Sequence, residues 1–261
     1  MKIGIIGGGN MASALLSGFI SSEAAKAEDV YLSDTDENKL LPWKERNVNC
    51  YTDNKIVAQK ADVIIFAVKP NVLPQVLSEI GGNLNKLYLS IAAGFSIEKL
   101  ESFLGEKARI VRAMPNTPAL VKCGMTVISP NKNISRKDKD TVVKLLSSVG
   151  AVTELEEKHI NVATALHGSS PAYIYMLIDA MADCGVKYGL KKEISLMLAA
   201  KAVEGSAKMV LESKEHIMKL KDDVCSPGGT TIEAVLSLEE NGFKTAVYKA
   251  IDSCIKKADN M

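Results

Sequence analysis

The stretch Ile3-Gly-Ile-Ile-Gly-Gly-Gly-Asn-Met-Ala-Ser-Ala-Leu-Leu16 decides the fold of the first half of this chain. An apolar run typical of a buried strand leads into a glycine-rich turn, and an apolar helical pattern follows. Gly7, Gly9 and Ala12 have the spacing Gly-x-Gly-x-x-Ala, the Gly/Ala form of the dinucleotide-binding fingerprint. The sequence therefore predicts a Rossmann-type strand, turn and helix.

Each small residue of this turn has a physical task. Gly7 permits the tight turn, and Gly9 lacks the side chain that would keep a pyrophosphate away from the backbone. Ala12 is small enough for the helix to pack near the strand. The free N–H groups at the helix start, together with the positive end of the helix dipole, then face the phosphates. We therefore expect this turn to bind a dinucleotide.

The pattern continues outward from this turn to about residue 150. Short apolar runs alternate with amphipathic segments, which is typical of βαβ units around a parallel sheet covered on both faces. Strands are expected at Lys2–Ile6, Val30–Ser33, Val48–Tyr51, Val63–Ala67, Leu87–Ile91 and Arg109–Ala113, with Gly124–Ser129 and Ala151–Glu154 extending the sheet. Helical patterns occupy Asn10–Ser22, Asn54–Gln59, Val72–Glu79 and Ile97–Leu104, and the segment Arg136–Val149 separates the last two strands. These elements predict an α/β fold with a doubly wound sheet.

The composition changes after about residue 157. Strand-like runs vanish, and apolar residues recur at helical spacing to the end of the chain. Pro171 suits the first turn of a long helix over Ala172–Tyr188, and Gly189 suits its end. We therefore expect an NAD(P)-binding Rossmann domain at residues 1–156 and an all-helical domain at 157–261. Helices this apolar point to a subunit interface.

Composition and charge exclude several classes of function. With 261 residues and 47% hydrophobic content, the chain can form two domains that each bury a core. Its net charge of +1, with acidic and basic residues well mixed, offers no footprint for nucleic acid. The first apolar run is too short for a signal peptide, and no run is long enough to span a bilayer. We therefore expect a cytoplasmic protein that acts on a small molecule.

The cysteines and histidines predict neither disulfides nor a metal site. The five cysteines are odd in number and scattered, and no Cys-x-x-Cys pair occurs. The three histidines do not have a metal-binding spacing. We therefore expect no bound metal.

The second expected strand ends at Asp34, where a Rossmann fold places the residue that reads the adenosine ribose. A carboxylate there accepts hydrogen bonds from the ribose hydroxyls and repels a 2′-phosphate, which favours NAD. Ser33 and Thr35 flank it, however, and Lys39 or Lys44 could reach a phosphate. The choice between NADH and NADPH therefore stays open, as does a plain turn or cap role for Asp34.

Three further loops follow expected strands, at the sheet edge where open α/β sheets bind ligands. They are Phe66-Ala-Val-Lys-Pro70, Leu89-Ser-Ile-Ala-Ala-Gly94 and Arg112-Ala-Met-Pro-Asn-Thr-Pro118. The last presents Asn116 and Thr117 as a boundary of a nicotinamide pocket or serves as a rigid connection. Neither a nucleotide-triphosphate loop nor a Gly-x-Ser-x-Gly elbow occurs. This combination favours hydride transfer, in which the cofactor carries the chemistry.

A second glycine-rich turn lies at Ser226-Pro-Gly-Gly-Thr-Thr-Ile-Glu233. Thr230 and Glu233 have the spacing of a capping box, in which each side chain bonds a backbone N–H at the helix start. The two glycines expose backbone N–H groups, and Ser226 and Thr231 add hydroxyls. With the helix dipole, this turn is a seat for a small carboxylate.

Five motifs together resemble the Δ1-pyrroline-5-carboxylate reductase family. They are Gly7-Gly-Gly-Asn-Met-Ala12, Ala67-Val-Lys-Pro70, Met114-Pro-Asn-Thr-Pro118, Gly168-Ser-Ser-Pro-Ala-Tyr173 and Asp222-Asp-Val-Cys-Ser-Pro-Gly-Gly-Thr-Thr231, and the last is the family's signature. The resemblance covers essentially the whole chain. It implies reduction of L-1-pyrroline-5-carboxylate to L-proline with NADPH or NADH, by hydride transfer to ring carbon C5. It also implies a helical dimerisation domain that interlocks with a partner's to form a homodimer, with higher assembly left open.

The resemblance also implies roles for single residues. The residues that would line the cofactor are Gly7, Gly8, Gly9, Asn10, Met11, Asp34, Asn54, Ala67, Val68, Lys69, Pro70, Ala92 and Ala93. The residues that would contact the substrate are Ser226, Gly229, Thr230, Thr231, Asp223 and Glu157. The first three would hold its carboxylate, largely through backbone donors. Thr231 would bond the ring nitrogen and is the expected catalytic residue.

Two departures from the family and two rival functions also follow from the sequence. Ser170 stands where many members have glycine, and Asp34 stands where members that prefer NADPH often have a small or basic residue. A β-hydroxyacid dehydrogenase needs a lysine on the first long helix of its second domain, where this chain offers only Lys187 at the far end. A reductase of another cyclic imine stays open. A non-catalytic NAD(P)-responsive scaffold need not keep the second glycine turn.

Overall fold

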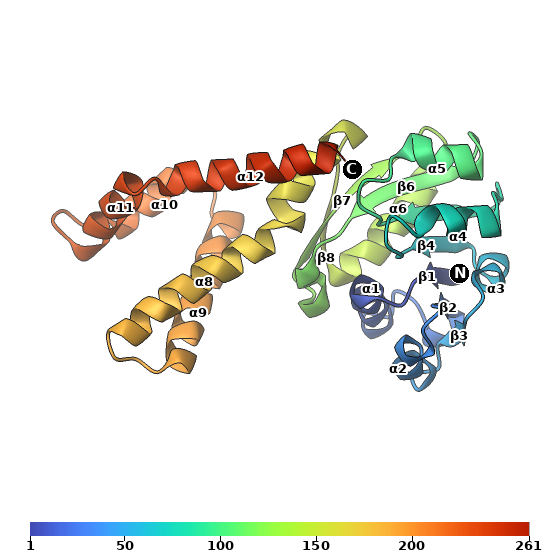
Figure 1. Ribbon diagram of the computed structural model, residues 1–261, viewed down its shortest axis with the longest axis horizontal. Helices are drawn as coiled ribbons and strands as arrows, with labels where there is room; N and C mark the ends of the chain where they lie inside the picture. Colours follow the sequence, from blue (N-terminus) through green and yellow to red (C-terminus); the bar gives the residue numbers. More distant parts are fainter. Residues whose placement is uncertain (261) are drawn as a thin grey trace. The chain divides into compact units, whose positions relative to one another are not determined.

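The computed structural model describes residues 1–260, and the chain divides into two compact units (Figure 1). One unit comprises Met1–Gly168 and the end of the chain from Lys257, and the other comprises Ser169–Lys256. The first unit thus continues past residue 156, the end of the domain expected from composition. The domain division at 156 and 157 remains a prediction.

The first unit is built on one eight-stranded sheet, labelled β1 to β8 in Figure 1. The strands are β1 Ile3–Ile6, β2 Val30–Ser33, β3 Asn49–Tyr51, β4 Val63–Phe66, β5 Leu87–Ser90, β6 Arg109–Met114, β7 Gly124–Pro130 and β8 Gly150–Glu154. Their order is β3-β2-β1-β4-β5-β6-β7-β8, and every neighbouring pair is parallel except β6 with β7. The predicted doubly wound sheet is confirmed. Its order switches direction at β1, between β2 and β4, where such folds bind ligands.

The helices of this unit are α1 Asn10–Ser21, α2 Leu41–Lys44, α3 Asn54–Lys60, α4 Leu73–Ile80, α5 Ile97–Leu104, α6 Arg136–Leu146 and α7 Ile160–Ala163. The four helices predicted in this unit are present as α1, α3, α4 and α5, with boundaries shifted by a few residues, and α2, α6 and α7 were not individually predicted. Short 3₁₀ turns include η2 Glu37–Lys39, η3 Thr117–Val121 and η5 Glu157–His159, and a π-helical turn, η6, spans Thr164–Gly168.

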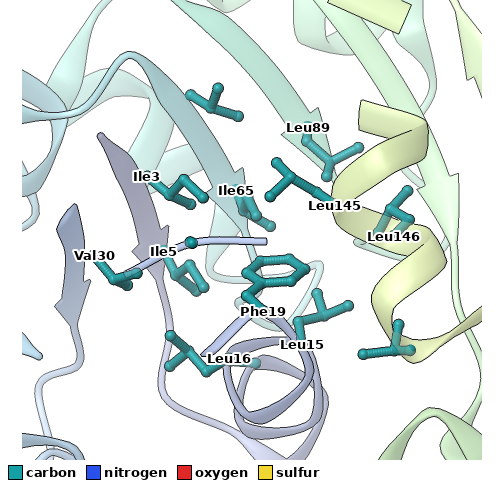
Figure 2. Packing of buried hydrophobic residues seen from close by; sticks show 14 of the residues in the cluster. Ile3, Ile5, Leu15, Leu16, Phe19, Val30, Ile65, Leu89, Leu145 and Leu146 are labelled. Atoms are coloured by element: carbon teal, nitrogen blue, oxygen red, sulfur yellow. The ribbon is translucent and has the colours of Figure 1, made fainter. Parts of the chain in front are cut away.

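Strands β1, β2, β4 and β5 are buried along their whole length because helices cover both faces of the sheet. Alternate strand residues pack against α1 and α6 on one face and against α3, α4 and α5 on the other. Figure 2 shows the first layer, where the ring of Phe19 from α1 lies among Ile5, Ile65 and Leu145. Phe19 is fully buried, and its replacement by alanine is expected to cost about 3–5 kcal/mol. This packing holds the glycine turn before α1 at the sheet edge.

The second unit is helical throughout, as the sequence predicts. Its helices are α8 Ser170–Lys187, α9 Lys192–Glu212, α10 Ile217–Val224, α11 Thr230–Glu240 and α12 Phe243–Asp259, whose last residues belong to the first unit. Gly189 has a φ of +94° after α8, and the Leu190 N–H donates to Gly185 O at 3.0 Å, so α8 ends in a Schellman motif. Within Ser169–Lys256 only Ala182, Ser195 and Ala199 are buried. This unit therefore has almost no core of its own.

Candidate functional site

A cavity of about 240 Å³ opens at the carboxyl edge of the sheet, over the ends of β1, β2 and β4. Its lining residues are Gly7, Gly9, Ser33, Asp34, Thr35, Lys39, Asn54, Ala67, Val68, Lys69, Val72 and Val76. Seven of the thirteen predicted cofactor residues are among them, drawn from four segments far apart in the sequence. A larger cavity of about 330 Å³ beside α3 and α4 contains none of the predicted residues. Size alone therefore does not identify the site, and the position at the switch point does.

The glycine turn is fixed by backbone geometry. Gly7 has a φ of +103°, and a Cβ there would lie 2.6 Å from Ala67 O. The Gly7 N–H donates to Ser33 O at 2.7 Å, which joins the turn to the end of β2. A side chain at Gly7 would therefore break the junction of β1 with β2 and β4.

Gly9 leaves room for a ligand at the start of α1. A Cβ added there meets no protein atom within 4 Å, so the space above it is open to the cavity. Gly9 is also the N-cap of α1, with no side chain bonded to the helix N–H groups and no acid in the first turn. The free N–H groups and the dipole suit a pyrophosphate. The residues of this turn thus fit a dinucleotide.

Asp34 lies in the same cavity and is already engaged by the protein. Its Oδ2 accepts a hydrogen bond from Gly8 N at 2.7 Å, its Oδ1 accepts one from Asp36 N at 2.9 Å, and the Lys39 ammonium lies 3.2 Å away. Burial raises the pKa of the Asp34 carboxyl, but these N–H donors and Lys39 outweigh burial and hold the pKa below its ordinary value. The carboxylate is therefore ionised at neutral pH.

The other predicted cofactor residues lie around this cavity or along the sheet edge. Asn54 accepts from Ser33 Oγ at 2.8 Å and donates to Glu79, so its amide is held at the cavity. Asn10 and Met11 begin α1, and Gly8 and Pro70 follow β1 and β4 in the chain. Ala92 is buried after β5, and Ala93 packs against the cluster that includes Met114 and Ile160. These last two residues do not line the cavity.

Glu157, expected near the substrate, is bonded inside the first unit. Its Oε1 accepts from Arg112 Nη1 at 2.9 Å and from Ile97 N at 2.7 Å. The Arg112 side chain is only 7% exposed, and it lies on β6. Glu157 thus joins β6 to the start of α5 and steadies the loop that follows Ala92 and Ala93.

His167 is a residue that the sequence reasoning missed. Its two ring nitrogens lie 2.8 Å from Met114 O and 2.5 Å from Ala163 O, and the Asn116 side chain donates to His167 O at 3.0 Å. The π-helical turn η6 brings these groups together, and such turns are frequent at functional sites. His167 therefore anchors the proline-rich loop after β6. Its position just before Gly168-Ser-Ser-Pro was the only available signal.

The second glycine turn leaves an open helix start, as predicted, but lacks the predicted capping box. Gly228 has a φ of +66°, Gly229 is the extended N-cap of α11, and the Gly229 N–H donates to Ser226 O at 3.0 Å. A Cβ on Gly229 would lie 2.2 Å from Ser226 Oγ. The predicted capping box of Thr230 and Glu233 is wrong, because α11 begins at Thr230 and its N-cap has no side-chain bond. The helix N–H groups are thus left free, as in α1.

The remaining predicted substrate residues of this turn differ in their surroundings. Thr231 is half-buried in the first turn of α11, whereas Ser226 and Thr230 are exposed. Asp223 lies on α10 and forms an exposed ion pair with Lys219 at 2.7 Å on the same helix. A surface pair of this kind contributes at most about 0.5 kcal/mol. The Asp223 carboxylate is therefore easily released for another partner.

Residues 1–260 contain neither a candidate metal cluster nor a candidate membrane span. No group of three or more histidine, cysteine, aspartate and glutamate residues in that part of the chain could hold a metal ion. None of the helices there is long and apolar enough to cross a membrane.

Comparison with known proteins covers both units. A family model described as pyrroline-5-carboxylate reductase dimerisation matches residues 157–261, and one described as NADP oxidoreductase, coenzyme F420-dependent, matches residues 2–94. Pyrroline-5-carboxylate reductase of Escherichia coli (strain K12) is 44% identical over 100% of this chain and 98% of that protein. Human pyrroline-5-carboxylate reductase 2 is 39% identical over 98% of this chain and 82% of that protein.

A solved structure agrees with these sequence matches. The crystal structure of Plasmodium falciparum pyrroline carboxylate reductase with NADP bound is 37% identical, with a TM-score of 0.91. The match covers 99% of this chain and 97% of that chain.

Proposed function

This chain belongs to the pyrroline-5-carboxylate reductase family, and from that premise we propose how its residues share the work of the reaction. The enzyme reduces pyrroline-5-carboxylate to proline with NAD(P)H, the final step of proline biosynthesis. The observation that carries the proposed roles is the pair of glycine turns before α1 and α11, each of which opens a helix start without a side-chain cap.

Catalysis of this reaction depends more on aligning the substrate with the cofactor than on a protein acid. The protonated ring nitrogen of the cyclic imine already makes the imine carbon, which becomes C5 of proline, electrophilic, so no strong protein acid is needed. When bound, the reduced nicotinamide supplies the hydride. The protein holds the imine and the nicotinamide in the geometry for hydride transfer. In model reactions such alignment lowers the activation free energy by about 7–11 kcal/mol.

In the first unit, the glycine turn and α1 hold the cofactor pyrophosphate through backbone N–H groups. The open space at Gly9 and the required glycine at Gly7 support this role. The loop Ala67-Val-Lys-Pro70 forms the opposite wall, and Ala92 and Ala93 border the nicotinamide end. Gly8, Asn10, Met11, Asp34 and Asn54 complete the proposed cofactor set.

In the second unit, the start of α11 holds the substrate carboxylate. The Thr230 N–H and the Ser226 hydroxyl supply donors, Gly229 leaves the helix start open, and the helix dipole favours the negative charge. The Thr231 hydroxyl bonds the ring nitrogen and stabilises the amine that forms. Asp223 is an outer residue of this site. The bond from Arg112 to Glu157 supports a positioning role for Glu157, within the first unit, in the expected substrate set.

We also propose that the enzyme is a homodimer formed through its second unit. The dimerisation model matches that part of the chain, and the unit buries only three residues alone. Large apolar side chains exposed on α8 and α9 are Met176, Leu177, Met197, Leu198, Val210 and Leu211. A second copy would bury such a surface. A cytoplasmic location and the domain boundary at 156 and 157 complete the proposal.

The test is an NAD(P)H oxidation assay on the purified protein with pyrroline-5-carboxylate, and with the six-membered ring analogue as a matched substrate. We expect oxidation with the five-membered imine to be faster, with proline as the product. Faster turnover of the six-membered analogue would make the enzyme a different imine reductase. Cofactor binding without oxidation of either compound would favour the non-catalytic scaffold.

A further inference from the structure

We propose that Lys39 allows this enzyme to bind NADPH, because it neutralises the Asp34 carboxylate in the cofactor cavity. This inference rests on the proposed cofactor role of that cavity and deepens it by naming the residue that sets the choice of cofactor. Asp34 is then a positioning residue for the glycine turn rather than the reader of the ribose hydroxyls.

The contacts of Asp34 argue against a ribose-reading role. A carboxylate that discriminates for NAD offers its oxygens to two ribose hydroxyls. Each oxygen of Asp34 instead already accepts from two protein donors, Oδ2 from Gly8 N at 2.7 Å, Oδ1 from Asp36 N at 2.9 Å, and both from Lys39 Nζ. A Cβ on Gly8 would lie 3.3 Å from the Asp34 Cβ, so the side chain packs directly against the turn. Asp34 therefore clasps the loop that holds the pyrophosphate.

The Asp34 carboxylate that makes these hydrogen bonds is a negative charge in a cavity that must accept phosphates. The Asp34 side chain is only 10% exposed, so water screens its charge weakly. Of the residues that line the cavity, Asp34 is the one acid, and Lys39 and Lys69 are the cations. Without a cation beside Asp34, a 2′-phosphate at this end of the cavity would be repelled.

Lys39 is placed to cancel this charge. Its Nζ lies 3.2 Å from Oδ1 and 3.3 Å from Oδ2 of Asp34, so it straddles the carboxylate. The backbone of Lys39 closes η2 through a bond from its N–H to Asp36 O at 3.1 Å, and Asp36 itself bonds Asp34. The pair is thus built by one short turn, directly after the strand that delivers Asp34. The adenosine ribose of NADPH, with its 2′-phosphate, and that of NADH, without it, then both face a cavity edge of nearly zero net charge.

The experiment compares Lys39→Met with the control Lys60→Met, an equal loss of charge on an exposed lysine at the end of α3 that does not line the cavity. Calorimetry measures binding of 2′,5′-ADP and of ADP, which carry the adenosine half of the cofactor with and without the 2′-phosphate. We expect Lys39→Met to weaken binding of 2′,5′-ADP by about tenfold or more, the scale of one poorly screened charge pair, and binding of ADP by less than about twofold. KM for NADPH should rise by a similar factor and KM for NADH by less than about twofold, and Lys60→Met should match the parent enzyme.

A second variant tests the mechanism. Asp34→Asn keeps an oxygen for the Gly8 N–H and removes the negative charge, so Asp34→Asn combined with Lys39→Met should recover most of the 2′,5′-ADP affinity. Equal losses for 2′,5′-ADP and ADP in Lys39→Met, no loss for either, or no recovery in the double variant would each overturn the inference. Because these probes lack nicotinamide, the result does not depend on which imine the enzyme reduces. A parent protein that binds neither probe would instead overturn the proposed cofactor cavity.

Discussion

The starts of α1 and α11 have nearly the same local backbone structure, but the two helices differ greatly in how much of each is packed against the rest of the chain. In each, a glycine with positive φ, Gly7 or Gly228, precedes an extended glycine N-cap, Gly9 or Gly229, and no side chain caps the helix. Helix α1 buries six residues against the sheet, whereas α11 buries none in the single chain. An anion-binding helix start thus needs only a few residues of sequence, but its rigidity depends on what packs around it.

The same contrast appears in what the glycines must avoid. A Cβ at Gly7 would clash with the backbone of Ala67, the residue after β4, whereas one at Gly228 meets no atom within 4 Å. The first turn is therefore restrained by the sheet and the second mainly by its own Ser226 to Gly229 bond.

The largest expected effect separates the two positive-φ glycines. Gly7→Ala should lower the free energy of unfolding by about 3 kcal/mol or more, because it adds a backbone clash to a strained φ. Gly228→Ala should cost about 1 kcal/mol, for the strained φ alone. Urea unfolding of both variants measures the difference. Equal losses would mean that the two turns are restrained alike.

The next effect concerns chemistry at α11. Thr231→Ala should lower kcat about a hundredfold, because the hydroxyl orients the ring nitrogen and stabilises the forming amine. Dissociation constants for NADPH should stay within about twofold, since Thr231 lies outside the cofactor cavity. Ser237→Ala, an exposed change on the same helix, is the control. Unchanged steady-state kinetics in Thr231→Ala would remove the catalytic role assigned to it.

A smaller effect tests the open space at α1. Gly9→Ala should leave the free energy of unfolding within about 0.5 kcal/mol of the parent, because a Cβ there meets no protein atom. NADPH and NADH should both bind about tenfold or more weakly, since the new methyl group occupies the path of the pyrophosphate. Fluorescence titration with each cofactor measures this. Parent-like affinity would show that the pyrophosphate does not approach Gly9.

The smallest expected effect concerns Asp34, whose carboxylate bonds the glycine turn before α1. Its pKa is lower in the folded protein than in the unfolded chain, so the carboxylate stabilises the fold above the unfolded-state pKa. That contribution is lost as pH falls through the lower folded-state pKa. Asp34→Asn should cost about 1 kcal/mol at pH 7, and the gap from the parent should close below about pH 4. A gap that stays constant down to pH 3 would contradict the ionised clasp.

The parts predicted best from sequence are those governed by local patterns. The spacing of Gly7, Gly9 and Ala12 predicted β1, the turn and α1, and Asn10 is indeed the first residue of that helix. The apolar runs predicted the strands to within a residue or two. The change of composition near residue 157 predicted the helical second half, which the dimerisation model also covers.

The sequence was wrong or silent where a boundary or a long-range contact decided the outcome. A one-residue shift in the start of α11 replaced the expected capping box with a bare glycine cap. Glu157 found its partner on β6, and no local spacing indicates a bond to Arg112 across 45 residues. His167 bonds Met114 O through a π-helical turn that no periodicity indicates.

The sequence by itself therefore determined the fold class, the two glycine turns and, through its motifs, the family. These features follow from backbone freedom, helix capping and side-chain periodicity, which act within a few residues of each other. Only the tertiary structure decided that Asp34 clasps Gly8 and is paired with Lys39, because the state of a carboxylate depends on the donors and charges that surround it in space.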